Sequence, residues 1–112
     1  MSRTIGILGE RQAEKFLKKL GYKIIDRNFS SRFGEIDLIA QDNNYLVFIE
    51  VKKRKNTSHG NGAEFVDVAK QRKIIKTANM YIQFNQIDSD IRFDVIEINN
   101  NTINHIKNAF FC

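Results

Sequence analysis

The chain has 112 residues, of which 42% are hydrophobic and 28% are charged, with a formal net charge of +5. This composition excludes a disordered chain, and the length fits one domain spanning residues 1–112. The apolar runs are too short to span a membrane and no leader pattern opens the chain, so we expect a cytoplasmic protein. The single cysteine, Cys112, excludes an internal disulfide. The basic excess favours a polyanionic partner.

A first helix is predicted from Ile5 to Leu20, with Thr4 as its N-cap and Gly21 as its C-terminal stop. Apolar and small side chains recur at helical spacing along one stripe of this segment. Glu10 lies at the edge of that stripe. Its carboxylate is either an ordinary solvated charge or one that reaches a site at the end of a sheet.

A short strand is predicted from Tyr22 to Phe29, followed by a hairpin whose strands cover residues 34–41 and 45–54. Asn43 and Asn44 fit a two-residue turn, because asparagine tolerates positive φ. In that register Asp42 pairs with Tyr45.

The same register places Asp37 opposite Glu50 and Glu35 opposite Lys52 on one face of the hairpin. Like charges that face each other need full solvation or a cation. Carboxylate oxygens suit a hard ion such as Mg²⁺ or Mn²⁺. The alternative is a solvent-facing strand pair of mixed charge, and the spacing alone leaves both interpretations open.

The polar segment KNTSHGNG, residues 55–62, predicts a loop, and His59 within it is interpreted as a solvated side chain. A second helix is predicted from Asp67 to Gln86. Gln71 lies on its apolar stripe, so its amide either bonds nearby backbone or points into a polar site.

Ile91 to Asn99 reads IRFDVIEIN and predicts another strand, followed by a last short strand around residues 102–106. Asp94 shares a strand face with Arg92. It is interpreted as a pairing or turn-capping residue and ranks below Asp37 and Glu50 as a site candidate.

Motif order adds a resemblance to known families. The pattern GEIDLI, a gap and then IEVK resembles the metal-binding signature of restriction-endonuclease-like nucleases. GERQAEKFLKKLGYKIIDRNF, VFIEVKKR and RFDVI resemble the bacterial YraN family over nearly the whole chain, with a fold similar to that of archaeal Holliday-junction resolvases. The resemblance implies an α/β restriction-endonuclease-like fold, with a central mixed sheet of about five strands flanked by two main helices.

Carried over to this chain, the resemblance implies that Asp37 and Glu50 hold Mg²⁺ or Mn²⁺ together with the Val51 carbonyl. Lys52 would orient or help to deprotonate the attacking water, with Glu10 and Gln71 bordering the site. Further basic residues would contact backbone phosphates; these are Lys53, Arg54, Lys55, Arg72 and Lys73.

Three hypotheses therefore remain. The leading one is a metal-dependent endonuclease acting on DNA, with branched or damaged DNA as candidate substrates and a homodimer as a candidate assembly. The second is a non-catalytic nucleic-acid-binding module that retains the nuclease fold. The third is a partner-binding protein whose charged face is merely solvated.

Overall fold

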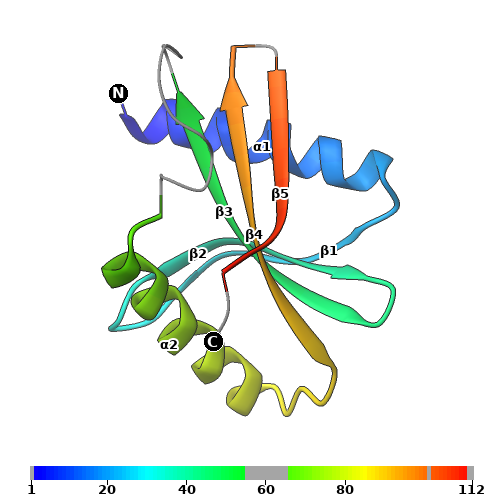
Figure 1. Cartoon of the computed structure of the whole chain (residues 1–112), viewed down its shortest axis with the longest axis vertical. Helices are drawn as coiled ribbons and strands as arrows, with labels where there is room; N and C mark the ends of the chain where they lie inside the picture. Colours follow the sequence, from blue (N-terminus) through cyan, green and yellow to red (C-terminus); the bar gives the residue numbers. More distant parts are fainter. Residues whose placement is uncertain (1, 55–65, 101, 111–112) are drawn as a thin grey trace.

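A computed structural model describes residues 2–54, 66–100 and 102–110 of the chain (Figure 1). It has an α/β architecture in which a five-stranded mixed sheet is flanked by two helices, as predicted. The elements are α1 (Ser2–Lys19), β1 (Lys23–Ser30), β2 (Glu35–Asp42), β3 (Tyr45–Arg54), α2 (Val68–Phe84), β4 (Asp90–Asn99) and β5 (Thr102–Phe110).

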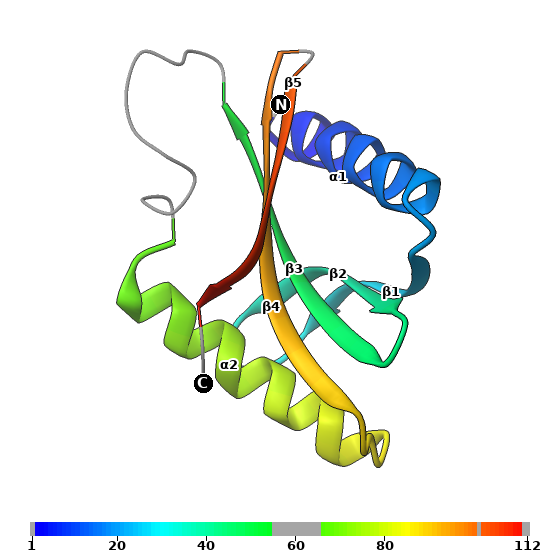
Figure 2. The ribbon, with the colours of Figure 1, turned by 45° about the vertical axis from the view of Figure 1, so that its right-hand side comes forward.

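The strands lie side by side in sequence order. β3 and β4 are parallel, and each of the other neighbouring pairs is antiparallel. A parallel pair needs a crossover, and the segment that contains α2 supplies it. Figure 2 shows α1 and α2 on opposite faces of the sheet, so residues from both helices can approach the same strands.

The hairpin prediction is confirmed in its turn and in its register from Asp42 to Leu38, but the predicted pairs of Asp37 with Glu50 and of Glu35 with Lys52 are not part of the ladder. Asn43 has φ 54°, and Asp42 pairs with Tyr45. The β2–β3 ladder continues residue by residue to the pair of Leu38 and Ile49, where the paired register ends. Asp37 and Glu50 are the next residues on their strands, just beyond this last pair.

Two apolar clusters attach the helices to the sheet. On one face, Ala13 and Leu17 of α1 pack with strand residues that include Val47 and Ile96. On the other face, α2 buries Ile74, Ala78 and Tyr81 against a cluster that includes Phe48 and Phe93. Alternate residues of β3 and β4 therefore face different helices, as the two-residue period of a strand requires.

Several predicted boundaries need correction. α1 begins at Ser2, so Thr4 lies inside the helix and is not its N-cap, whereas Gly21 with φ 96° does end it in the left-handed region. Asp67 caps α2 by accepting a hydrogen bond from the Lys70 amide at 2.8 Å. β5 is longer than predicted, because it continues beyond Ile106 to Phe110. No helix in these described ranges is long and apolar enough to cross a membrane.

A buried polar network explains the extension of β5. The ladder between β4 and β5 shifts register between Phe93 and Val95, and Asn108 adopts φ 57°. The backbone amide of Asn108 donates to Asp94 Oδ1 at 3.0 Å, so a side-chain oxygen takes the place of a strand carbonyl as its acceptor at the irregularity.

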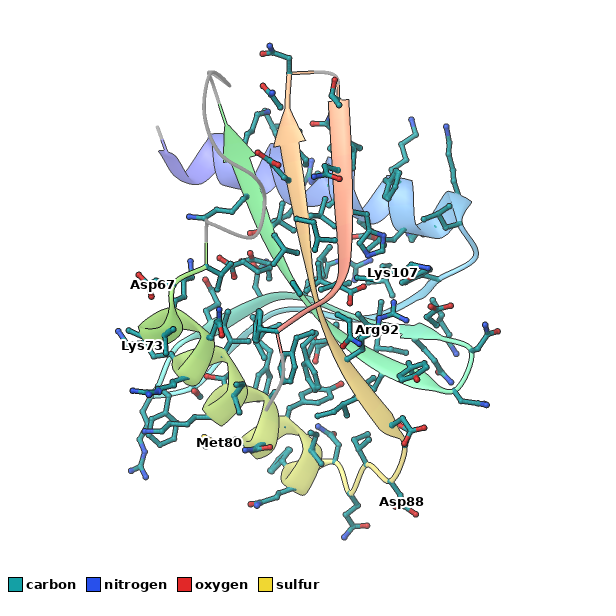
Figure 3. The ribbon with its side chains drawn as sticks, viewed as in Figure 1. Asp67, Lys73, Met80, Asp88, Arg92 and Lys107 are labelled. Atoms are coloured by element: carbon teal, nitrogen blue, oxygen red, sulfur yellow. The ribbon has the colours of Figure 1, made fainter. Side chains whose placement is uncertain are left out.

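Asp94 is fully buried and is also held by charged groups. The Arg92 guanidinium donates to both carboxylate oxygens, at 2.9 and 3.0 Å, and His105 Nε2 lies 2.7 Å from Oδ2. Burial acts to raise the pKa of Asp94, but the hydrogen bonds from His105, Arg92 and Asn108 outweigh it and keep the pKa below its ordinary value. Arg92, marked in Figure 3, also donates to Asp42 and Tyr22, so this network joins the hairpin to β4 and β5.

Candidate functional site

Four carboxylates from three elements meet where the β2–β3 ladder ends. Glu10 comes from α1, Glu35 and Asp37 from β2, and Glu50 from β3, and the charges of the other three all act on Asp37. We call Glu10, Glu35, Asp37 and Glu50 the acidic cluster. Asp37 Oδ2 accepts a hydrogen bond from the Val51 amide at 2.8 Å. The Asp37 carboxylate thus accepts the hydrogen bond of a β3 backbone amide just beyond the last pair of the β2–β3 ladder.

The pKa of Asp37 reflects both its burial and the negative charge of the acidic cluster. Burial and repulsion from Glu50 together raise the pKa of Asp37 to about 8, and the hydrogen bond from the Val51 amide only partly opposes them. Burial also raises the pKa of Glu10, although hydrogen bonding to Asn28 and Asp37 offsets part of the effect. A cation placed among these groups would favour their ionised forms.

Lys70 is a site residue that the sequence analysis missed. Its Nζ lies 2.5 Å from Glu50 Oε2, and Glu50 is only 6% exposed. Burial acts to lower the pKa of Lys70, but the ion pair with Glu50 outweighs burial and raises it. Lys70 lies three residues after Asp67 and four before Ile74, so helical spacing places it on the side of α2 that faces the sheet but does not identify Glu50 as its partner.

The two other predicted catalytic residues, Lys52 of β3 and Gln71 of α2, lie beside other groups. Lys52 is half-buried and lies across from Glu97 in the β3–β4 ladder. Gln71 is also half-buried, and its Nε2 donates to the Val66 carbonyl at 2.9 Å. The structure therefore brings Glu10, Asp37 and Glu50 together, and places Lys70 on Glu50. The catalytic roles of Lys52 and Gln71 stay predictions.

The predicted phosphate contacts fall on two sides of the molecule. Lys53 is exposed on β3, and its side chain passes 3.6 Å from the place where a Cβ on Gly9 of α1 would lie. Arg72 and Lys73 are exposed on α2. The side chain of Arg54 lies outside the described part of the structure, and so do Lys55, His59 and Cys112.

A groove of about 530 Å³ opens beside Glu10. Basic and acidic side chains of α1 and β1 mix along its wall. Glu14 is already paired there with Arg27, and with Lys18 at 3.0 Å, and these contacts lower the pKa of Glu14 to about 2. Arg11 and Lys15 also line the groove, and neither makes an ion pair within the described ranges.

The donor chemistry of the acidic cluster fits a hard divalent cation, because its ligands would be carboxylate oxygens with a surplus of negative charge. No three His, Cys, Asp or Glu side chains in residues 2–54, 66–100 and 102–110 stand in a ready metal-binding arrangement. A cation at Glu50 would have to share that carboxylate with Lys70 or displace the lysine.

Comparison with known proteins gives consistent results. The model of the family described as "Uncharacterised protein family UPF0102" matches residues 9–98. A UPF0102 protein of Persephonella marina is 50% identical over 103 residues, which cover 91% of this chain and 89% of that protein. A relative from Thermodesulfovibrio yellowstonii is 46% identical over 107 residues, covering 96% of each chain. One from Clostridium beijerinckii is 44% identical over 117 aligned positions, covering 98% of this chain and 95% of that protein.

Proposed function

The chain belongs to the UPF0102 protein family, and we propose that it is a metal-dependent endonuclease that hydrolyses phosphodiester bonds in DNA, with branched or damaged DNA as candidate substrates. The observation that carries this proposal is the meeting of Glu10, Asp37 and Glu50, from α1, β2 and β3, where the hairpin ladder ends. The order of the helices and strands supports a restriction-endonuclease-like fold as part of the same proposal.

The proposed cofactor is Mg²⁺ or Mn²⁺, held by the Asp37 and Glu50 carboxylates with the Val51 carbonyl. When bound, such an ion supplies Lewis-acid polarisation of a phosphoryl oxygen and acidifies water. The Val51 amide already fixes one Asp37 oxygen. The donating amide belongs to the peptide that joins Glu50 to Val51. The hydrogen bond therefore limits how far the Asp37 carboxylate of β2 can move from Glu50 of β3.

The remaining side chains have proposed roles around the reacting phosphate. Lys52 orients the attacking water and places a positive charge beside the phosphoryl group as its negative charge grows. Glu10 and Gln71 border the pocket from the two helices. Lys70 balances the charge of Glu50 while no cation is bound.

The second candidate function is a non-catalytic nucleic-acid-binding module. The specific observation in its favour is the ion pair of Lys70 with Glu50, which supplies an internal counter-ion to the carboxylate that would otherwise bind metal. A protein that has no use for a cation could keep this arrangement permanently.

Metal binding is the first test. We expect Mn²⁺ to bind the native protein in a calorimetric titration and to bind Asp37→Asn much more weakly, because the substitution removes a carboxylate ligand. Asp88→Asn is the matched control and should bind like the native protein, because Asp88 lies two residues before Asp90, which pairs with Tyr45, five positions along β3 from Glu50. Absence of Mn²⁺ binding by the native protein would sink the metal site.

Cleavage is the second test. Branched and linear DNA are incubated with Mn²⁺ and native protein, Lys52→Ala or Asp37→Asn, all purified in parallel. We expect cleavage by the native protein and a loss of about 100-fold or more in the variants. Equal traces of cleavage in all three preparations would indicate a contaminant and would leave the binding module as the better hypothesis.

A further inference from the structure

A basic and aromatic patch adjoins the acidic cluster, and Lys73 is its one member that was already a predicted phosphate contact. It consists of Arg32 and Phe33 in the β1–β2 turn and Lys73 and Lys76 of α2. The three cations are exposed, and Phe33 is half-buried. No ion pair to any of these cations is seen within the described ranges, so their charges are available to a ligand. We call these four residues the turn–helix patch.

Phe33 organises two of the cations. The Arg32 guanidinium carbon lies 5.0 Å from the centroid of the Phe33 ring, and Lys76 Nζ lies 5.3 Å from the same centroid. Both distances are within the range of a cation–π interaction. The ring therefore holds together two cations that belong to different elements and would otherwise repel each other.

The turn that carries Arg32 and Phe33 is fixed to α2. Ser31 Oγ accepts hydrogen bonds from the Phe33 amide at 3.0 Å and the Gly34 amide at 3.3 Å, and it shares a hydrogen bond of 2.8 Å with the fully buried Thr77 hydroxyl. A Cβ at Gly34 would lie 3.4 Å from Lys73 Cβ, so turn and helix are in close contact there. Figure 1 shows this connection beside α2.

The patch is also continuous with the acidic cluster. Glu35 directly follows Gly34 in the chain, and its charge acts on both Asp37 and Glu10. Along α2, Lys70, Lys73 and Lys76 follow at three-residue spacing, which spans about 9 Å of helix axis. Positive side chains thus lead away from the carboxylates along one side of the helix.

We propose that the turn–helix patch binds backbone phosphates of DNA next to the scissile phosphodiester, with Phe33 as the residue that positions Arg32 and Lys76. This inference rests on the proposed nuclease function and names a contact surface for its substrate. A phosphodiester that approaches four carboxylates is repelled, and adjacent cations offset that repulsion. The planar guanidinium of Arg32 and the ammonium of Lys76 both bind phosphate without reading bases, so the contact is independent of sequence.

The test measures DNA binding without cleavage. Fluorescence anisotropy of a labelled DNA duplex is recorded in EDTA over a series of salt concentrations, for the native protein and for Arg32→Ala/Lys76→Ala. We expect the double variant to lower the slope of log K against log salt by about 1.8, because each phosphate contact contributes about 0.9. Phe33→Ala keeps every charge, so we expect an unchanged slope with affinity reduced about two- to fivefold.

Two controls make this result specific. Lys23→Ala/Lys107→Ala removes the same net charge from exposed positions on β1 and β5, and Figure 3 shows Lys107 far from Lys73. Phe33→Tyr keeps an aromatic ring and should bind like the native protein. Thermal melting verifies that each variant is folded.

Three outcomes would overturn the inference: no DNA binding in EDTA, equal losses in the two double variants, or a Phe33→Ala variant that binds like the native protein. Because binding is measured without metal, a failure of cleavage with these binding differences intact would refute the nuclease proposal and leave the phosphate contacts in place.

Discussion

Replacing Lys70 with methionine removes the cation beside Glu50 and keeps most of the aliphatic length of the side chain. In the native protein, Lys70 Nζ lies 2.5 Å from Glu50 Oε2, with side-chain exposures of 42% for Lys70 and 7% for Glu50. Breaking a buried ion pair costs about 3–5 kcal/mol, and the exposure of Lys70 reduces this. We expect Lys70→Met to lower the free energy of unfolding in EDTA by about 1–2 kcal/mol, or about 5–10 °C in Tm.

Mn²⁺ should then stabilise Lys70→Met more than it stabilises the native protein, because it no longer competes with the ammonium group. A metal concentration ten times the Kd adds about 1.4 kcal/mol of stability. The assay is thermal melting of both proteins in EDTA and in rising Mn²⁺. Glu50→Gln/Lys70→Met is the control, since without the Glu50 charge both the cost in EDTA and the extra Mn²⁺ response should disappear. Equal Tm values and equal Mn²⁺ shifts for Lys70→Met and the native protein would refute this account of Lys70.

Two further predictions concern the frame that holds the site. Asp94→Asn should lower the free energy of unfolding by about 3 kcal/mol in urea denaturation at pH 7, because Arg92 would lose a buried charged partner. The pKa of Asp94 is lowered in the folded protein, so its stabilisation is present above about pH 4, its unfolded value, and is lost as pH falls through the folded value. The gap between native and variant should therefore narrow below pH 4, and a gap independent of pH would contradict this. Asn43→Val should lower Tm by several degrees because Asn43 has φ 54°, whereas Asn43→Gly should not, and equal effects would show that backbone strain is not the cause.

The hairpin could be predicted because its determinants are local. The residue pair Asn43-Asn44 fits a tight turn, and the alternating side chains that follow fix which residues share a face. Once the turn is placed, the register follows without knowledge of any other element. That register brings Asp37 and Glu50 to the end of the ladder, but the ladder itself stops at Leu38 and Ile49, and the hydrogen bond from the Val51 amide to Asp37 was not predicted.

The contacts that the sequence analysis missed depend on tertiary structure. A lysine on a helix is usually solvated, and only the packing of α2 against the sheet shows that Lys70 meets Glu50. The continuation of β5 requires Asp94 to bind the Asn108 amide, a partner 14 residues away. Helical spacing from Ile74 places Thr77 on the buried side of α2, but its hydrogen bond to Ser31, 46 residues away, could not be predicted from the sequence.

A nuclease and a binding module would differ in whether a metal ion can replace Lys70 as the partner of the Glu50 carboxylate. Both functions need the same sheet, the same helices and the same basic flanks. Only the nuclease needs Glu50 to leave Lys70, and the 42% exposure of that lysine gives its ammonium group a route into solvent. Asp37 differs from Glu50, because the hydrogen bond that it accepts at 2.8 Å comes from the neutral amide of Val51 and not from a cation. Because the pKa of Asp37 is raised to about 8, this carboxyl group holds a proton at neutral pH, and a cation that binds the acidic cluster would displace that proton.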